Sequence, residues 1–257
     1  MTAKKNVSAS ERLTDLLQNL KLYTVSEQLC TRLESVNKGS AIETVLEVFE
    51  LEQQIRWDRK VERLRRASRL PVGKTFGNFD GNRLPIPLMR TLKKLAKASF
   101  LDRAVNVLAF GLPGTGKSHA ACALGHELVA AGHSVLFTPT YKLVQDLLVA
   151  KRDYMLPKAL KKLDNYELLI LDDLGYVQQG PDEIEVLFTL LAERYERRSI
   201  LITSNLVFSE WEKIFKNPMT TAAAIDRLVH HSEILEFSVE SYRTKSKKED
   251  KAKRRTK

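Results

Sequence analysis

Near the middle of this 257-residue sequence stands Gly111-Leu-Pro-Gly-Thr-Gly116-Lys117-Ser118. The apolar run from Val105 to Phe110 precedes it with the pattern of a buried strand, and the residues from His119 onward have the pattern of a helix. Glycines placed between a strand and a helix let consecutive backbone N–H groups converge on phosphate oxygens at the positive end of the helix dipole. The motif therefore predicts a P-loop, a cradle for the phosphates of a nucleotide.

Two side chains of this loop have expected roles in ATP binding. Lys117 is expected to reach the β- and γ-phosphates, and the hydroxyl of Ser118 is expected to ligate Mg²⁺. An ordinary glycine turn is the alternative, but it would leave the flanking strand and helix patterns unexplained. The residues expected to contact the nucleotide are Gly111, Leu112, Pro113, Gly114, Thr115, Gly116, Lys117, Ser118 and His119.

Polar residues end two further apolar strand patterns. The run Leu168–Leu171 is followed by Asp172 and Asp173, and the run Ile200–Thr203 is followed closely by Asn205. We expect Asp172 to be the carboxylate on the Mg²⁺ side and Asp173 to deprotonate the attacking water. The amide of Asn205 is placed to help position the same water. The alternative is that the two acids only cap the next turn.

The segment from Ala222 to Leu228 has a helical pattern and holds Asp226 next to Arg227. A guanidinium aimed at the γ-phosphate of a neighbouring subunit would act as an arginine finger. From the residues alone, a surface pair between Asp226 and Arg227 is the simpler explanation.

Strand and helix patterns alternate from residue 104 to residue 203, which predicts an α/β core with a mostly parallel sheet covered by helices on both faces. One of these helices is expected over residues 183–196, behind Asp182. The first 70 residues have helical spacing, with a long helix expected from about residue 41 to 67. We therefore expect a helical N-terminal domain over 1–70, an ATPase domain over 71–242 and a basic tail over 243–257.

The formal charge of +10 favours a polyanionic partner. Residues 243–257 carry nine Lys or Arg against two acids, hence +7, and such a segment is expected to be disordered. Cys30 and Cys122 form no metal-ligand pattern and are expected to be buried thiols. Because no apolar run approaches the roughly 18 residues of a membrane span and no signal core follows Met1, we expect a soluble protein of the bacterial cytoplasm, associated with the nucleoid when on DNA.

In this order the elements resemble an AAA+ ATPase, and residues 11–243 are similar to the IstB-type transposition helper ATPases of insertion sequences. The DnaC and DnaI helicase loaders are relatives of that family. Beyond the P-loop, the resemblance rests on Asp172-Asp-Leu-Gly-Tyr176, Thr203-Ser-Asn205, Phe208-Ser-Glu-Trp211, Asp226-Arg-Leu-Val229 and Glu240-Ser-Tyr-Arg243.

The resemblance implies a homo-oligomer that assembles with ATP on double-stranded DNA, chooses or prepares the target and recruits the transposase. It implies that Asp172 is the Walker B acid, Asn205 is sensor 1 and Arg227 is a finger acting in trans. Asp173 departs from the glutamate of many such proteins, and its shorter side chain would slow hydrolysis without weakening ATP binding. No helical domain follows Arg243, so no C-terminal lid domain is expected.

DNA contacts are expected from basic residues, because contacts to phosphates give affinity without reading the base sequence. Each of these residues is alternatively a solvated position on an amphipathic helix. The candidates near the second strand are Lys142, Lys151, Arg152, Lys158, Lys161 and Lys162, and those on the long helix are Arg56, Arg59 and Arg63.

Three other functions share the P-loop. A replicative helicase loader of the DnaC/DnaI type would prefer single-stranded DNA and hold a helicase. A nucleotide-switched scaffold would bend DNA with negligible hydrolysis, an alternative that the short side chain of Asp173 keeps open. A small-molecule kinase would need an acceptor pocket, and residues 130–170 show no pattern for one.

Overall fold

The computed structural model describes residues 14–15, 17–34, 41–176, 180–206, 210–211, 222, 225–226, 228–239 and 241. The chain divides into two compact units, the first ending at Arg63 and the second beginning at Leu64. The division lies within a helix, a few residues before the domain boundary expected at residue 70. Among the described residues, no helix combines the length and the apolar character that crossing a membrane requires.

The first unit is helical, as the sequence predicts. It contains α2 (Tyr23–Glu34) and most of α3 (Ala41–Ser68), which confirms the helix expected from about residue 41 to 67. Its described core is small and consists of Leu17, Val25, Leu29 and Val48, with Leu22 packed against them. Because so few apolar side chains are buried, polar contacts contribute visibly to the packing of this unit.

The clearest of these contacts surrounds the buried carboxylate of Glu52. The main-chain N–H of Thr24 donates to it over 3.1 Å, and Nε of Arg56 donates over 2.6 Å. Burial alone would raise the pKa of Glu52, but these hydrogen bonds outweigh burial and lower it. Arg56 also donates from Nη2 to the carbonyl of Lys21. The guanidinium of Arg56 therefore joins α3 to the turn before α2.

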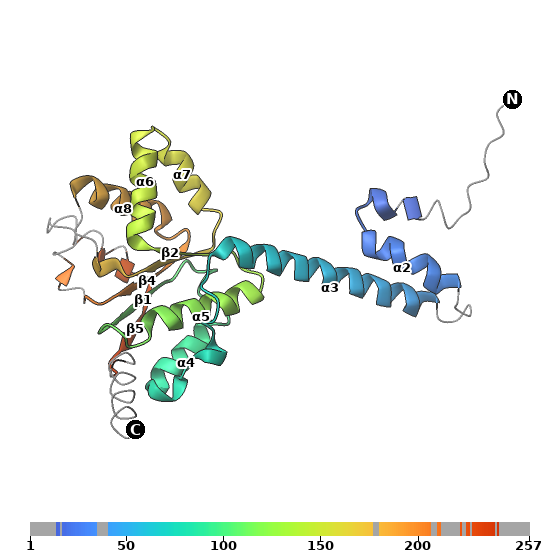
Figure 1. The fold of residues 1–257 in the computed structure, drawn as a ribbon, viewed down its shortest axis with the longest axis horizontal. Helices are drawn as coiled ribbons and strands as arrows, with labels where there is room; N and C mark the ends of the chain where they lie inside the picture. Colours follow the sequence, from blue (N-terminus) through green and yellow to red (C-terminus); the bar gives the residue numbers. More distant parts are fainter. Residues whose placement is uncertain are drawn as a thin grey trace, which may run out of the picture. The chain divides into compact units, whose positions relative to one another are not determined.

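The second unit contains one five-stranded sheet in the order β2-β3-β4-β1-β5 (Figure 1). All four pairings between neighbouring strands are parallel, which confirms the predicted sheet. The strands are β1 (Asn106–Gly111), β2 (Val135–Pro139), β3 (Leu168–Asp172), β4 (Ser199–Ser204) and β5 (Ser232–Phe237). The edge strand β5 is not predicted from the sequence.

Helices cover both faces of this sheet. One face carries α4 (Ile86–Leu95) and α5 (Lys117–Ala130), and the other carries α6 (Thr140–Arg152), α7 (Leu156–Leu163) and α8 (Pro181–Arg194) (Figure 1). Leu168 and Ile170 of β3 belong to the core with α5, while Leu169 and Leu171 belong to the core with α6 and α8. Both sides of β3 are thus buried, which explains why its sequence is apolar without alternation.

The helix α8 begins and ends two residues earlier than the expected range of 183–196. Pro181 occupies its first turn, where a missing N–H costs nothing. The N–H of Gly180, rather than a cap at Asp182, marks the start by donating to Oε2 of Glu183 over 2.7 Å. The helix has ended before Glu196, whose φ of +56° lies in the left-handed region.

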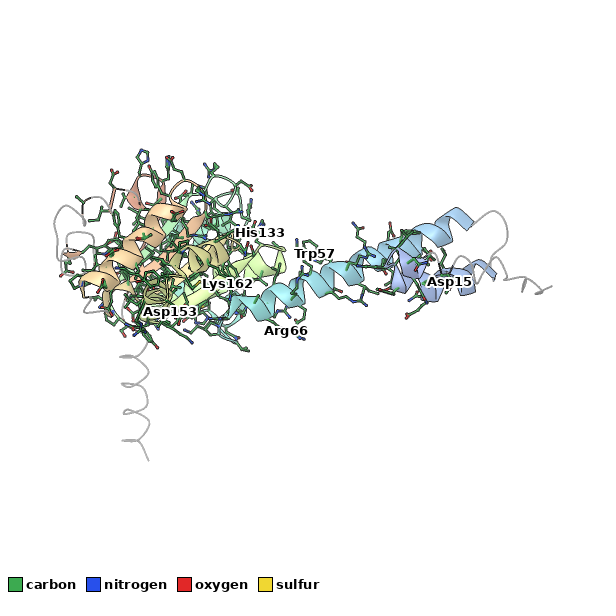
Figure 2. The ribbon with its side chains drawn as sticks, turned by 90° about the horizontal axis from the view of Figure 1, so that it is seen from above. Asp15, Trp57, Arg66, His133, Asp153 and Lys162 are labelled. Carbon is green, nitrogen blue, oxygen red and sulfur yellow. The ribbon has the colours of Figure 1, made fainter. Side chains whose placement is uncertain are left out.

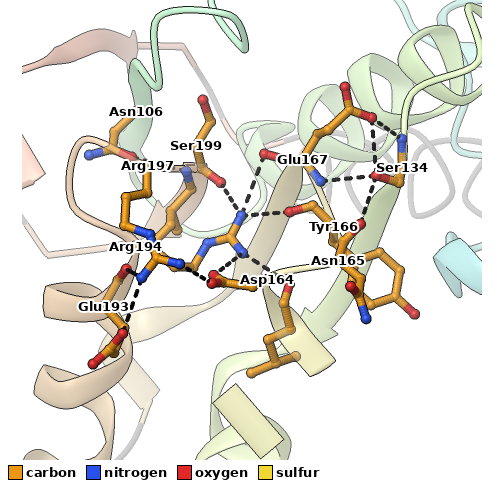
Figure 3. Close-up of polar contacts among 12 residues, drawn as sticks. Asn106, Ser134, Asp164, Asn165, Tyr166, Glu167, Glu193, Arg194, Arg197 and Ser199 are labelled. Carbon is orange, nitrogen blue, oxygen red and sulfur yellow. Dashed lines mark hydrogen bonds and ion pairs between the residues drawn. The ribbon is translucent and has the colours of Figure 1, made fainter. Parts of the chain in front are cut away.

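A buried arginine fastens the end of α8 to the sheet. The side chain of Arg194 is 1% exposed and donates to the carbonyls of Leu163, Tyr166 and Ser199 (Figure 3). Burial lowers the pKa of Arg194 to about 9, although Asp164, 3.8 Å away, opposes that shift. These carbonyls come from the end of α7, the turn before β3 and the start of β4, so Arg194 fixes where these strands begin.

A second polar cluster in the same region fastens the start of β2 to the start of β3. Oε2 of Glu167 accepts from the N–H of Ser134 over 2.7 Å (Figure 3). Its Oε1 lies 2.9 Å from Nδ1 of His133. Burial alone would raise the pKa of Glu167, but the hydrogen bonds from His133 and Ser134 outweigh it and lower the pKa.

Candidate nucleotide-binding site

The P-loop connects the carboxyl end of β1 to the amino end of α5, as expected. Its glycines use backbone conformations that other residues rarely adopt: φ is +82° at Gly114 and +103° at Gly116. Gly111 has φ +152°, and an added Cβ there would lie 2.6 Å from the carbonyl oxygen of Phe237 on β5. The loop therefore needs glycine at Gly111 for close approach to β5, and at the other two positions for its path around a ligand.

Lys117 begins α5 and is held inside the loop. Its side chain is 8% exposed, and Nζ donates to the carbonyls of Gly111 over 2.7 Å and Leu112 over 2.9 Å. The hydroxyl of buried Thr115 also donates to the carbonyl of Leu112. A cation held among backbone groups at a helix N-terminus suits an anionic ligand, and Ser118 follows it in the first turn of α5.

Asp172 and Asp173 lie where β3 ends, and a threonine of the neighbouring strand β4 joins them. The hydroxyl of Thr203 donates to Oδ1 of Asp172 over 2.7 Å and accepts from the main-chain N–H of Asp173 over 2.9 Å. Thr203 is 1% exposed, so this hydroxyl has little alternative in solvent. Its role as the group that orients Asp172 is missed from sequence, where Thr203 looks like the last residue of a strand.

Asp173 differs from Asp172 in both exposure and backbone. Its side chain is exposed, and its φ is +65°, a left-handed conformation that aspartate tolerates better than most residues. This conformation turns the chain immediately after β3, and the short 3₁₀ helix Leu174–Tyr176 follows. The two acids are therefore presented in different ways, which suits different chemical tasks.

Asn205 follows β4 and packs against the turn after β3. An added Cβ on Gly175 would overlap the amide oxygen of Asn205, so the two residues touch. The same oxygen, Oδ1, is buried and has no hydrogen-bond partner among the described residues. Buried polar atoms without a partner are uncommon and call for an explanation such as a ligand or a water. The buried amide oxygen of Asn205, beside the turn that follows the paired acids, is therefore a candidate for such a contact.

A cavity of about 490 Å³ opens beside the P-loop. Nε2 of His119 lies 3.0 Å from the carbonyl oxygen of Thr75, and the His119 ring lies 5.0 Å from that of Phe79. The segment before α4 thus forms one wall of the cavity, through Phe79 and its neighbours. The cavity is lined by Lys74, Asn78, Phe79, Asp80, Gly114, Gly116, Lys117, Ser118 and His119.

These residues fit a magnesium nucleotide. The carboxylate of Asp172 and the hydroxyl of Ser118 are hard oxygen ligands of the kind that Mg²⁺ prefers. Lys117 and the backbone N–H groups of the loop suit phosphate oxygens, and an aromatic wall with polar neighbours suits a nucleoside. A larger cavity of about 980 Å³ lies between α7 and α8, but it shares no residue with the P-loop, and among its residues Arg194 and Arg197 pair with Asp164.

Arg227, the expected finger, lies outside the described residues, and so does Arg243. Asp226, the neighbour of Arg227, is helical and exposed, and Leu228 is buried in the core with α8. The role expected for Arg227 stays a prediction.

The basic residues expected to contact DNA fall into two groups. Lys151 of α6 pairs with Asp182 over 3.0 Å and with Glu185 over 2.8 Å, and Arg56 of α3 is engaged with Glu52. Figure 2 labels Lys162 of α7 and Asp153 of the turn between α6 and α7. The remaining candidates are exposed and have no such ion pair among the described residues: Lys142, Arg152, Lys158, Lys161 and Lys162 in the second unit, and Arg59 and Arg63 in the first.

Comparison with known proteins identifies relatives over most of the chain. The profile of the family described as IstB-like ATP binding protein matches residues 13–250. An insertion sequence ATP-binding protein of Sinorhizobium fredii is 42% identical over 249 residues, which are 96% of this chain and 84% of that protein. The insertion sequence IS21 ATP-binding protein of Pseudomonas aeruginosa is 37% identical over 91% of this chain and 89% of its own length.

Solved structures show the same fold at lower identity. The DnaC helicase loader aligns with a TM-score of 0.51 and 21% identity over 60% of this chain and 89% of its own. The replication initiator DnaA bound to AMPPCP and single-stranded DNA aligns with a TM-score of 0.56 and 15% identity over 67% of this chain and 52% of its own. These likenesses confirm the fold of the second unit, a parallel sheet covered by helices, and carry nothing further about function.

Proposed function

The chain belongs to the family of IstB-like ATP-binding proteins, and from this premise we propose that it is a Mg²⁺-dependent ATPase that assembles as a homo-oligomer on double-stranded target DNA and assists the transposase of an insertion sequence. The observation that carries the ATPase part is the contact chain from Asp172 through the Thr203 hydroxyl to the N–H of Asp173. It orients the carboxylate of Asp172 and holds the backbone of Asp173 beside it at the end of β3, which supports the roles that we propose for the two acids.

Each residue of the nucleotide site has its own proposed role in ATP hydrolysis. The P-loop N–H groups and Lys117 would bind the phosphates, and Ser118 and Asp172 would hold a Mg²⁺ ion, which would supply charge neutralisation at the phosphate oxygens. Water attacks the γ-phosphorus, the bond to the bridging oxygen breaks, and ADP and phosphate result. Asp173 accepts the proton of that water, and the amide of Asn205 orients it through Oδ1.

Arg227 completes this site from a neighbouring subunit. An arginine finger stabilises charge that develops at the γ-phosphate, so its loss lowers turnover with little effect on ATP binding. We expect Arg227→Ala and Asp173→Ala to be inactive separately. Mixing them restores turnover, because some interfaces then combine an intact Asp173 with an intact Arg227. If the mixture stays inactive while both variants still bind ATP, the trans arrangement is contradicted.

The exposed residues of the turn between α6 and α7 support a DNA contact at the hairpin that these two helices form. Tyr154 is 93% exposed with φ +57°, and the N–H groups of Tyr154 and Met155 donate back to Lys151 and Ala150. Its ring is therefore held out in solvent by a defined turn and buries almost nothing in the described fold. An aromatic ring between basic residues suits the sugars and bases of DNA, which favours this partner over a purely solvated surface.

A salt titration tests this surface. Replacing Arg152 and Lys158 by alanine removes two phosphate contacts, so the slope of log K against log[salt] for duplex DNA should fall by about 2. Lys94→Ala is the matched control, because Lys94 lies on α4 and pairs with Glu233 over 2.8 Å. An unchanged slope in the double variant would exclude the hairpin from the DNA interface.

The properties of Asp173 favour a second candidate function. Asp173 is exposed, has a left-handed backbone and is one methylene shorter than glutamate, all of which suit slow hydrolysis. On this alternative the protein is a nucleotide-switched scaffold that deforms DNA while ATP is bound. Steady-state turnover with and without duplex DNA separates the two functions, because a scaffold shows negligible turnover in both conditions.

A further inference from the structure

Three potential metal ligands lie close together at the amino ends of the strands, at the opposite end of the sheet from the P-loop. Glu196 lies between α8 and β4, while His230 and His231 lie directly before β5. In the sheet, β4 and β5 are the two neighbours of β1. Because all three strands are parallel, the ligands gather at their amino ends, whereas the nucleotide site lies at their carboxyl ends.

The spacing of the ligand atoms suits one small cation. One ligand atom from each of Glu196, His230 and His231 lies within 4.8 Å of the other two. Nε2 of His231 is 3.4 Å from Oε1 of Glu196. Two ligands at about 2.0–2.1 Å from a tetrahedral zinc ion are themselves about 3.4 Å apart. This pair is therefore already at the required separation, and the ligand atom of His230 lies within 4.8 Å of both.

The backbone beneath these ligands is held by one buried side chain. Oδ1 of Asn106 accepts from the N–H of Ile200 on β4 over 3.0 Å, and its Nδ2 donates to the carbonyl of Leu228 over 3.4 Å. The main-chain N–H of Asn106 donates to the carbonyl of His231 over 2.7 Å. Asn106 thus joins β4, which follows Glu196, to the segment that carries both histidines, and such support preorganises a binding site.

A hydrogen bond also orients one of the histidines. The hydroxyl of Tyr195 lies 3.2 Å from Nδ1 of His230. Metal-binding histidines usually have their second ring nitrogen fixed in this way by a neighbouring group. The contact leaves Nε2 of His230 for the ligand role. Two imidazoles and one carboxylate with an open fourth position is a donor set that zinc accepts readily.

We propose that Glu196, His230 and His231 form a binding site for a divalent transition-metal ion, with Zn²⁺ as the best fit. The bound ion would fasten the turn after α8 to the residues that lead into β5. Arg227 stands three residues before His230 in the sequence, so the ion would also restrain the chain next to the predicted finger. The site itself is independent of the proposed ATPase function.

The test is a zinc titration of the full chain, purified without a histidine tag and kept reduced, followed by calorimetry. We expect one saturable equivalent of Zn²⁺ per chain. His231→Ala should abolish it, and Glu196→Gln should weaken it at least tenfold, because each removes a ligand. Tyr195→Phe keeps all three ligands and should weaken binding by about tenfold through the lost orienting contact.

His133→Ala is the matched control, since His133 also contacts a single glutamate, Glu167, over 2.9 Å but has no third ligand among the described residues. Cys30→Ser controls for binding of Zn²⁺ by the thiol of Cys30. Both should bind Zn²⁺ like the unaltered chain. Co²⁺ in place of Zn²⁺ gives an independent readout, because a tetrahedral site produces visible absorption that should vanish in His231→Ala.

Thermal unfolding gives a readout besides binding. With free Zn²⁺ at about 100 times its Kd, the Tm should rise by about 5–10 °C, and this rise should be absent in a His230→Ala, His231→Ala double variant. The proposal is overturned if no saturable equivalent is found. It is equally overturned if His231→Ala and Glu196→Gln bind Zn²⁺ unchanged, or if His133→Ala weakens binding as much as they do.

Discussion

Thr203→Val tests the contact that joins the two acids of the nucleotide site. Valine keeps the shape of threonine but removes the hydroxyl that donates to Asp172 over 2.7 Å and accepts from the N–H of Asp173 over 2.9 Å. The first is a hydrogen bond to a charged group, worth about 1.5–3 kcal/mol, and the second is worth about 1 kcal/mol. The sum is about 2–4 kcal/mol, because Thr203 is buried and water cannot replace the hydroxyl.

The assay is urea unfolding of the full chain followed by circular dichroism, together with the Mg²⁺ dependence of ATP turnover. Thr203→Val should lower the free energy of unfolding by this amount and raise the Mg²⁺ concentration for half-maximal turnover. Thr203→Ser keeps the hydroxyl and should recover most of both effects. Thr138→Val is the control: Thr138 is also buried near a strand end, but it donates to the carbonyl of Pro139.

The reasoning is refuted if Thr203→Val is no less stable than Thr138→Val and has an unchanged Mg²⁺ dependence. It is also refuted if Thr203→Ser is as impaired as the valine variant, because the effect would then come from the methyl group rather than the hydroxyl.

Three further predictions concern other parts of the second unit. Gly175→Ala would push against the amide oxygen of Asn205, so turnover should fall at least tenfold while ATP affinity is kept; a matching loss in an ATP titration would argue against this role. Burial raises the pKa of Cys122 to about 12. In a Cys30→Ser background, a thiol reagent at pH 8 should therefore label Cys122 in the native chain about 1000-fold more slowly than in the unfolded chain. Rapid labelling of the native chain would contradict this burial. Hydrogen bonds hold the pKa of Glu167 below its ordinary value. They stabilise the fold at a pH above the ordinary pKa, and this stabilisation is lost as the pH falls through the lowered pKa. Glu167→Gln should therefore flatten the acid side of the curve of unfolding free energy against pH, and an unchanged curve would show that the group does not matter.

Much of the fold follows from the sequence because its signals are local. The run Leu168–Leu171 is apolar at every position since both faces of β3 are covered, and this pattern marks a central parallel strand. The P-loop is equally local, because a glycine-rich turn needs only its own neighbours to be identified. The long helix α3 has no glycine or proline within it, so its length is also predictable.

The edge strand β5 was missed for a physical reason. Only one of its faces is buried, through Leu235 and Phe237, while Ile234 and Glu236 are exposed. A short half-buried strand has only a weak alternation, and its place beside β1 depends on contacts with residues more than 100 positions away. The alternation of Leu235, Glu236 and Phe237 was the one signal in the sequence.

The site shows the same division between local and distant information. Lys117, Asp172 and Asn205 are predictable because each ends or follows a recognisable element. The role of Thr203 depends on the register between β3 and β4, and the contact of Phe79 with His119 depends on how the segment before α4 folds back. The residue pattern of either segment alone does not indicate which residue it contacts in the other segment, so a single sequence does not reveal such contacts.

Sedimentation of the protein with labelled duplex DNA, in the presence of an ATP analogue or of ADP, tests whether ATP binding drives assembly on DNA. We expect a non-hydrolysable ATP analogue to drive assembly on the duplex and ADP not to do so. Lys117→Ala should abolish assembly, whereas Lys94→Ala should preserve it. Equal assembly on DNA with and without nucleotide, or in Lys117→Ala, would contradict the claim that ATP in the P-loop is the signal for assembly.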